Sequence, residues 1–375
     1  MMPSCAEVVP RLLVEAVGRD LHVSHGATLA LGQIVAGLGQ VAQDRGQGLQ
    51  EVLGPALVTG LQELVGNMVE KHKLRGLGGE MMRQAASHYI RLVSLSSLAL
   101  PPATLSSWLA VLEENLSSVE TAVQGAAVPA VPALLQQLLV RQGVLDTGAR
   151  DKLLDTYMTH LTGPDVARRG FSSALGALPA HLLAQREEEV ILALIRSSRI
   201  SEGTESWAEA RRDSVRALAA VTATVVAVLD QRLAPHIYDC FLVSLEDYTI
   251  DRRGDTGAWV REAAMSGLET VTVALLNRGT NMVPESIIAQ VGESYFLSGE
   301  HLISARPCLA SPSRPQRRSL GRGATPPGSS TPSCTLGARE GRSCQGSPAG
   351  RNYRTSSPGT STSTGSSSRR PSRAS

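Results

Sequence analysis

The stretch LEDYTIDRRGDTGAWVREAAM, residues 245–265, decides the fold because it joins two amphipathic helices through a charged turn. After the turn, apolar and small residues recur every three or four positions, which predicts a helix with one buried face. Those residues are Val260, Ala264, Gly267, Val271 and Leu275. The same spacing before the turn predicts a preceding helix with its own buried face, formed by Ile237, Phe241, Leu245 and Tyr248.

The turn between the two helices is rich in Asp, Arg and Gly. Asp255 is placed to accept backbone N–H groups from the first turn of the following helix. A single pair of helices cannot bury both of its apolar faces. The stretch therefore predicts similar helix pairs stacked on either side of it.

Second helices of this kind are predicted along the whole chain. Their aligned starts lie near His25, Arg83, Gln124, Arg169, Arg212 and Arg261, at separations of 58, 41, 45, 43 and 49 residues. Two-helix HEAT and armadillo units repeat every ~40–47 residues. We therefore expect residues 1–297 to form an all-α, HEAT/armadillo-like helical-repeat solenoid. In the third unit Pro129 and Pro132 predict a break or kink, because an interior proline costs a helix about 3 kcal/mol.

The helical pattern ends before a segment of different composition, residues 298–375. This segment contains 19 Ser, 9 Pro and 12 Arg, with no Lys and two acidic residues, for a net charge of +10. Such a composition cannot bury enough apolar surface to offset chain entropy, so it predicts a disordered tail. Its abrupt onset favours a frame change or an alternative 3′ exon, and an ordinary basic tail explains the composition equally well.

Charge, cysteines and apolar runs exclude several classes of protein. Residues 1–297 carry 24 basic and 32 acidic residues, a net charge of −8, so no general nucleic-acid-binding surface is expected there. The five cysteines form no CxxC pair, which argues against a zinc site or a disulfide framework. No signal peptide is recognisable, and Pro101 and Pro102 interrupt the longest uncharged run. We expect a cytoplasmic protein with no membrane span.

No motif in the sequence indicates catalysis. GxSxG, HExxH and P-loop motifs are lacking, so we expect no catalytic, cofactor-binding or metal-binding residues. His22 and His25 have a metal-compatible spacing but no third ligand, and a polar helix-start role is favoured. The tripeptide Arg253-Gly254-Asp255 matches a cell-adhesion motif, which is a coincidence in a protein without a secretion signal.

The charged turn supplies the candidate interaction residues. They are Asp247, Tyr248, Asp251, Arg252, Arg253, Asp255, Trp259 and Arg261. The charges have two interpretations, a salt-bridge ladder within the repeat or a surface offered to a partner. Trp207 and Trp259 start comparable helices, and packing between neighbouring repeats is favoured over a role as exposed anchors.

Five stretches also resemble a known family. They are DLHVSHG (20–26), RGLGGEMMRQA (75–85), RRGFSSALGALP (168–179), WAEARRDSVRALA (207–219) and, most specifically, residues 245–265. In their order along the chain and in the positions of their Gly, Trp and Asp-Arg-Arg residues, they resemble the tubulin-folding cofactor D family, also called tubulin-specific chaperone D. Family members are longer HEAT-repeat proteins, and the resemblance covers part of their C-terminal region.

The resemblance implies a chaperone that is not an enzyme by itself. Such proteins capture β-tubulin after chaperonin release and join tubulin-folding cofactors C and E to assemble the αβ heterodimer. They also bind an Arf-like small GTPase, and together with cofactor C they stimulate GTP hydrolysis by tubulin. The resemblance further implies association with the cytoskeleton and centrosome, and with cell junctions.

The sequence departs from this family at both ends. The first matching motif lies only about twenty residues after Met1, and the repeat pattern is lost after roughly residue 292. We therefore expect a truncated or alternative product that retains part of the partner-binding surface. The alternative is a transport or scaffolding adaptor whose basic tail binds RNA or acidic partners.

Overall fold

The computed structural model describes residues 5–141, 143–201, 207–279 and 283. Most of these residues are helical, and the only strands among them form two short hairpins. The predicted all-α class is confirmed at this level. The predicted disordered tail, residues 298–375, lies outside the described residues.

The helices alternate between two groups along the chain. The first helix of each pair is α1 (Cys5–Ala16), α4 (Pro55–Glu70), α6 (Pro102–Leu116), α9 (Thr147–His160), α12 (Glu187–Ser198) or α14 (Ala234–Ser244). The second is α2 (Leu21–Asp44), α5 (Gly79–Leu95), α7 (Thr121–Ala127) with α8 (Ala130–Leu139), α10 (Asp165–Gly176), α13 (Ala208–Val225) or α15 (Gly257–Arg278). Short elements between them are α3 (Leu49–Leu53), α11 (Ala180–Leu183) and a 3-10 turn, η1 (Gln231–Leu233). A helix is present at each of the six predicted positions.

Helices of the same group contact one another in chain order. Among the second helices, α2 contacts α5, α5 contacts α7 and α8, α10 contacts α13, and α13 contacts α15. Among the first helices, α1 contacts α4, α4 contacts α6, and α12 contacts both α9 and α14. Contacts of α10 with α6 and of α9 with α8 join the fourth helix pair to the third. Each pair thus buries its apolar faces against neighbouring pairs.

Small residues allow the second helices to pack closely. A Cβ added at Gly39 of α2 would lie 2.6 Å from the carbonyl oxygen of Ser96, just beyond α5. One added at Gly176 of α10 would lie 2.9 Å from the Cα of Ala217 in α13. Side chains at these positions would force the helices apart, so the abundant Ala and Gly set the spacing between pairs.

Two local predictions have clear outcomes. The break at the prolines is confirmed, because α7 ends at Ala127 and α8 begins at Ala130, with Pro129 as its N-cap residue. The placement of Tyr248 on a buried helix face is wrong. Helix α14 ends at Ser244, and Tyr248 lies beyond it with 70% of its surface exposed. The helical spacing of apolar residues continues past Leu245 by chance, although the chain there has left the helix and leads into a turn.

One helical stretch of the described chain could cross a membrane, judged by its length and apolar composition alone. It is Thr121–Leu139, and 56% of it is buried inside the protein. Core helices of soluble proteins pass the same test, so the stretch is weak evidence for a span. The expectation of no membrane span is compatible with this finding.

Candidate functional site: a polar seam beneath an exposed hairpin

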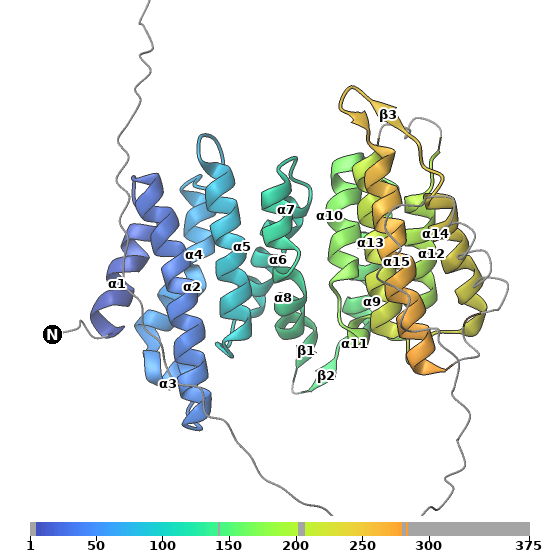
Figure 1. Ribbon diagram of the computed structural model, residues 1–375. Helices are drawn as coiled ribbons and strands as arrows, with labels where there is room; N and C mark the ends of the chain where they lie inside the picture. The colour runs from blue at the N-terminus through green and yellow to red at the C-terminus, as the bar shows by residue number, and fades with distance from the viewer. Residues whose placement is uncertain (1–4, 142, 202–206, 280–282, 284–375) are drawn as a thin grey trace, which may run out of the picture. The chain divides into compact units, whose positions relative to one another are not determined.

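The charged turn contains a small β-hairpin that the sequence did not predict. Strands β3 (Ile250–Asp251) and β4 (Gly254–Asp255) pair antiparallel, with Ile250 opposite Asp255. Gly254 has φ of 108°, a backbone conformation that favours glycine at the end of the tight turn. In Figure 1 the hairpin projects past the ends of the neighbouring helices.

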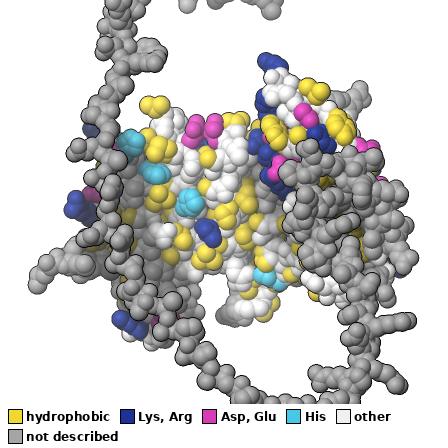
Figure 2. Space-filling model, viewed as in Figure 1, with side chains coloured by type: hydrophobic (Ala, Val, Ile, Leu, Met, Phe, Trp, Pro, Cys, Tyr) yellow, Lys and Arg dark blue, Asp and Glu magenta, His cyan; other side chains and the backbone are white. Residues whose placement is uncertain are grey.

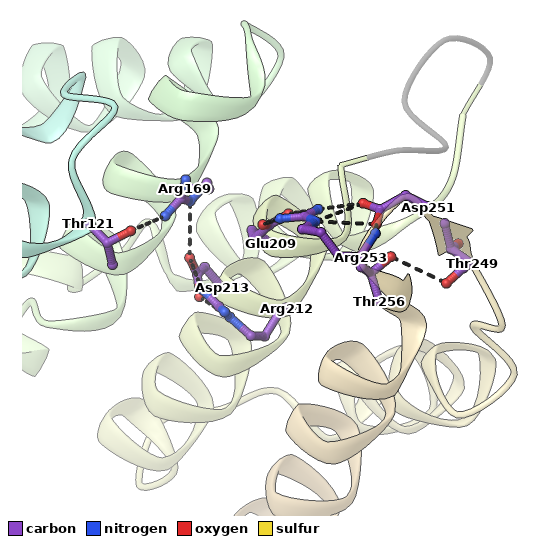
Figure 3. Close-up of polar contacts among 9 residues, drawn as sticks. All are labelled: Thr121, Arg169, Glu209, Arg212, Asp213, Thr249, Asp251, Arg253 and Thr256. Atoms are coloured by element: carbon purple, nitrogen blue, oxygen red, sulfur yellow. Dashed lines mark hydrogen bonds and ion pairs between the residues drawn. The ribbon is translucent and has the colours of Figure 1, made fainter. Parts of the chain in front are cut away.

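The base of the hairpin is fixed to α15 by backbone contacts. The Gly257 N–H donates to the Thr249 carbonyl at 2.9 Å, and the Thr256 hydroxyl donates to the same oxygen at 3.3 Å (Figure 3). Gly257 is required here because a Cβ would overlap the carbonyl of Asp247. As predicted, the Asp255 carboxylate accepts a backbone N–H of the first helical turn, that of Ala258, at 3.1 Å.

Below the hairpin, Asp247 forms a buried ion pair with Arg211 of α13. The Arg211 Nε lies 2.7 Å from Asp247 Oδ2, and the side chains are only 1% and 4% exposed. Thr249 completes the group, accepting from Arg211 at 2.9 Å and donating to Asp247 at 2.6 Å. Burial acts to raise the pKa of Asp247, but hydrogen bonds from Arg211 and Thr249 outweigh it and hold that pKa below its usual value. The carboxylate is therefore held in its charged form.

Arg261 connects the hairpin to its own helix. It donates to the Asp247 carbonyl at 2.6 Å and to the Asp255 carboxylate at 2.7 Å. Its guanidinium also lies over the Tyr248 ring, 4.5 Å from the centroid. The hydrogen bond from Arg261 lowers the pKa of Asp255. One arginine thus ties together three points of the turn.

Arg253 connects the tip of the hairpin to α13. It forms ion pairs with Asp251 and with Glu209 in the first turn of α13 (Figure 3). Its guanidinium lies 5.1 Å from the centroid of the Trp259 ring. Burial acts to raise the pKa of Glu209, but hydrogen bonds, first that from Arg253, and the charges of Arg253 and Arg169 together hold that pKa below its usual value. The hairpin is therefore held across two helix pairs.

The same line of charges continues to α10. Arg169 Nε lies 3.8 Å from Asp213 Oδ2, and Arg169 also donates to the Thr121 hydroxyl at 2.8 Å (Figure 3). Nearby, the Arg168 guanidinium lies 5.0 Å from the Trp207 ring centroid. We call these ion-paired residues the polar seam: Arg169, Glu209, Arg211, Asp213, Asp247, Asp251, Arg253, Asp255 and Arg261. The seam links the starts of α10, α13 and α15.

The structure divides the predicted residues into two sets. Asp247, Asp251, Arg253, Asp255 and Arg261 belong to the seam, and Trp259 is half-buried beside it. Tyr248 and Arg252 are exposed on the hairpin. The ion pairs Arg169–Asp213, Arg211–Asp247 and Arg253–Glu209 run between helix pairs. The predicted ladder within one repeat describes the others, which are Arg212–Asp213, Asp251–Arg253 and Asp255–Arg261.

Sequence reasoning missed four residues of this region. Glu209, Arg211 and Asp213 hold the seam from α13, and Ile250 is 75% exposed on the hairpin. The sequence contained a signal for the first three residues. In the alignment of helix starts, Arg212 occupies the same position as Arg169 and Arg261, and the three missed residues flank Arg212. Which charges would pair across neighbouring helices depends on packing, which no local pattern describes.

Metal-ligating groups, thiols and grooves are the features of the described residues that bear on chemistry and binding. No group of three or more metal-ligating side chains occurs within the described ranges. The thiol of Cys240 is buried against Ser198, and burial raises its pKa, which makes it a poor nucleophile.

Two grooves open between first helices, one of about 460 Å³ between α9 and α12 and one of about 300 Å³ between α12 and α14. No known protein-family model matches the chain.

Proposed function

We propose that this protein is a non-enzymatic scaffold built as a HEAT/armadillo-like solenoid. The proposal is supported by helix pairs that contact their neighbours in chain order and by the sequence period of 41–49 residues over most of the array. Stacked helix pairs expose long surfaces suited to large protein partners. The structure also holds a projecting hairpin by ion pairs, as expected of an element with a binding role.

The partner we propose is β-tubulin, during assembly of the αβ heterodimer after chaperonin release. The observation that carries this proposal is the resemblance of residues 245–265 to the tubulin-folding cofactor D family, because this stretch forms the exposed hairpin. Cofactors C and E and the Arf-like small GTPase are proposed as further partners on the same grounds. Stimulation of tubulin GTP hydrolysis would require cofactor C, and the site of action would be the cytoplasm near the cytoskeleton.

Pull-down experiments with the full chain test this function. We expect it to retain β-tubulin released from chaperonin and to retain the Arf-like GTPase. The binding reactions should include a folded helical-repeat protein of unrelated sequence as control. A correctly folded chain that binds neither protein would contradict the proposal.

The second candidate is an adaptor whose tail binds RNA or acidic proteins. It is favoured by the net charge of +10 in residues 298–375. A full-length variant with the tail arginines replaced by glutamine separates the two functions. The adaptor requires a large, salt-sensitive loss of binding in this variant, because phosphate or carboxylate contacts release counterions. The tubulin scaffold requires binding that is independent of the tail.

A further inference from the structure

Three exposed side chains gather on the hairpin above the polar seam. Ile250 is 75% exposed, Tyr248 is 70% exposed, and Arg252 at the turn is exposed as well. Figure 2 shows hydrophobic and basic side chains side by side on this projection. Single exposed apolar residues are common on protein surfaces.

Ion pairs and hydrogen bonds hold the hairpin in place, although Ile250 and Arg252 are exposed and Tyr248 is mostly exposed, with its ring face against Arg261. Asp247 and Arg261 fix its base, and Arg253 fixes its tip to Glu209. Burying the Asp247–Arg211 pair costs desolvation energy that an apolar pair would avoid. Buried ion pairs of this kind add little stability and define geometry. The fold therefore maintains the position of a segment whose own side chains are open to solvent.

The charges of the hairpin indicate what would bind there. Among the described residues of 247–261, Arg252 is the one charged side chain that forms no ion pair. Residues 247–261 contain three Asp and three Arg and are neutral overall, so the positive charge at the tip is the local charge of Arg252. The tail, residues 298–375, contains 12 Arg and two acidic residues, so it offers few carboxylates to pair with Arg252, which argues against the chain's own tail as the occupant. A complementary surface would be apolar with carboxylates at its edge.

We propose that Tyr248, Ile250 and Arg252 form a docking tip for a protein partner that presents an apolar pocket bordered by acidic residues. Tyrosine and arginine are enriched among the residues that contribute most to protein interfaces. The isoleucine fills the pocket, the tyrosine covers its edge, and the arginine pairs with a carboxylate. This inference rests on the proposed function, because it assigns the tip to the contact with β-tubulin.

Binding of the full chain to β-tubulin released from chaperonin tests the docking tip. We expect Ile250→Ser and Arg252→Glu each to raise the Kd at least about tenfold. The loss for Arg252→Glu should shrink at high salt, whereas the loss for Ile250→Ser should persist. The matched control is Val144→Ser, because Val144 is 71% exposed on the other hairpin, between α8 and α9. It should bind like the wild type.

The outcomes separate this inference from the proposed function. Binding by the wild type with unchanged Kd in both tip variants would overturn the docking tip alone. Failure of the wild type to bind would overturn the proposed function and the docking tip with it. A dimer of the chain that dissociates on Ile250→Ser would identify a second copy as the occupant and overturn the acidic-partner assignment. Unfolding midpoints of all variants should match the wild type, since the substituted side chains are exposed.

Discussion

Helices at the two ends of the described chain are held together by different interactions. Between α2 and α5 the contacts are uncharged, with Gly32 of α2 close to Leu92 and Tyr89 of α5. Helices α13 and α15 also bury apolar faces, and ion pairs are added between α13 and the segment that carries the hairpin, among them Arg211–Asp247 and Arg253–Glu209. Figure 2 shows acidic and basic side chains gathered around the hairpin.

The difference shows what each kind of contact can achieve. Packing between small apolar residues does not depend on the orientation of particular atoms. It holds two helices together wherever their surfaces are complementary. Ion pairs with hydrogen bonds are directional, so they fix the position of a segment that has little apolar surface to bury. The seam therefore occurs where a projecting hairpin must be held in one orientation.

The largest expected effect follows from breaking the buried pair of the seam. Arg211→Met leaves the Asp247 carboxylate buried without its main partner, which should lower the free energy of unfolding by about 3–5 kcal/mol. Urea unfolding of the full chain measures this. The double variant Arg211→Met, Asp247→Leu should recover much of the loss, because it removes the stranded charge.

The control for this prediction comes from the other end of the chain. Arg11 and Glu15 form an exposed pair one helical turn apart in α1, with Arg11 81% exposed. Arg11→Met should change the free energy of unfolding by only about 0.5 kcal/mol or less. Equal losses for Arg211→Met and Arg11→Met would remove the distinction between seam and surface pairs.

The next largest effect tests the uncharged contacts between α2 and α5. Gly39→Ala should lower the free energy of unfolding by about 1–3 kcal/mol, because the new Cβ meets the Ser96 carbonyl. Gly37→Ala in the same helix is the control, since its Cβ meets nothing within 4 Å. That variant should gain up to about 1 kcal/mol from helix propensity. Destabilisation by both substitutions would show that spacing between helices is not the cause.

Acidification should weaken the seam before it weakens the α2–α5 contact. The pKa values of Asp247 and Glu209 are lowered in the folded protein, so their stabilising contribution is present above the ordinary carboxyl pKa and is lost as pH falls through the folded values. Burial raises the pKa of Asp165, which opposes this trend in part. Hydrogen exchange at pH 7 and near pH 3.5 should show a larger fall in opening free energy for α13 and α15 than for α2 and α5. Equal falls would contradict the charged character assigned to the seam.

The smallest expected effect concerns the exposed end of the seam. Arg253 is 48% exposed, so Arg253→Gln should cost no more than about 1 kcal/mol of global stability. Amide exchange in the hairpin should nevertheless accelerate, because the ties to Glu209 and Asp251 are lost. The accelerated exchange should be reproduced in the wild type by high salt. Unchanged exchange in the hairpin would show that Arg253 does not restrain it.

The sequence alone predicts much of the helical framework and little of the seam. Apolar spacing placed the second helices, and Pro129 marked the break between α7 and α8, because both signals are local. Helical spacing misplaced Tyr248, since continued periodicity does not show where a helix ends. Arg211 and Ile250 were missed because the pairing of a buried arginine and the exposure of an isoleucine depend on the packing of helices distant in sequence.

The most direct test of the central claim is hydrogen–deuterium exchange of the full chain with and without β-tubulin released from chaperonin. We predict slower exchange of the hairpin amides, residues 248–256, when β-tubulin is bound. Amides of the control hairpin around Val144 should exchange at the same rate in both samples. Binding without protection of residues 248–256, or with equal protection of both hairpins, would contradict the claim that the seam positions a docking tip.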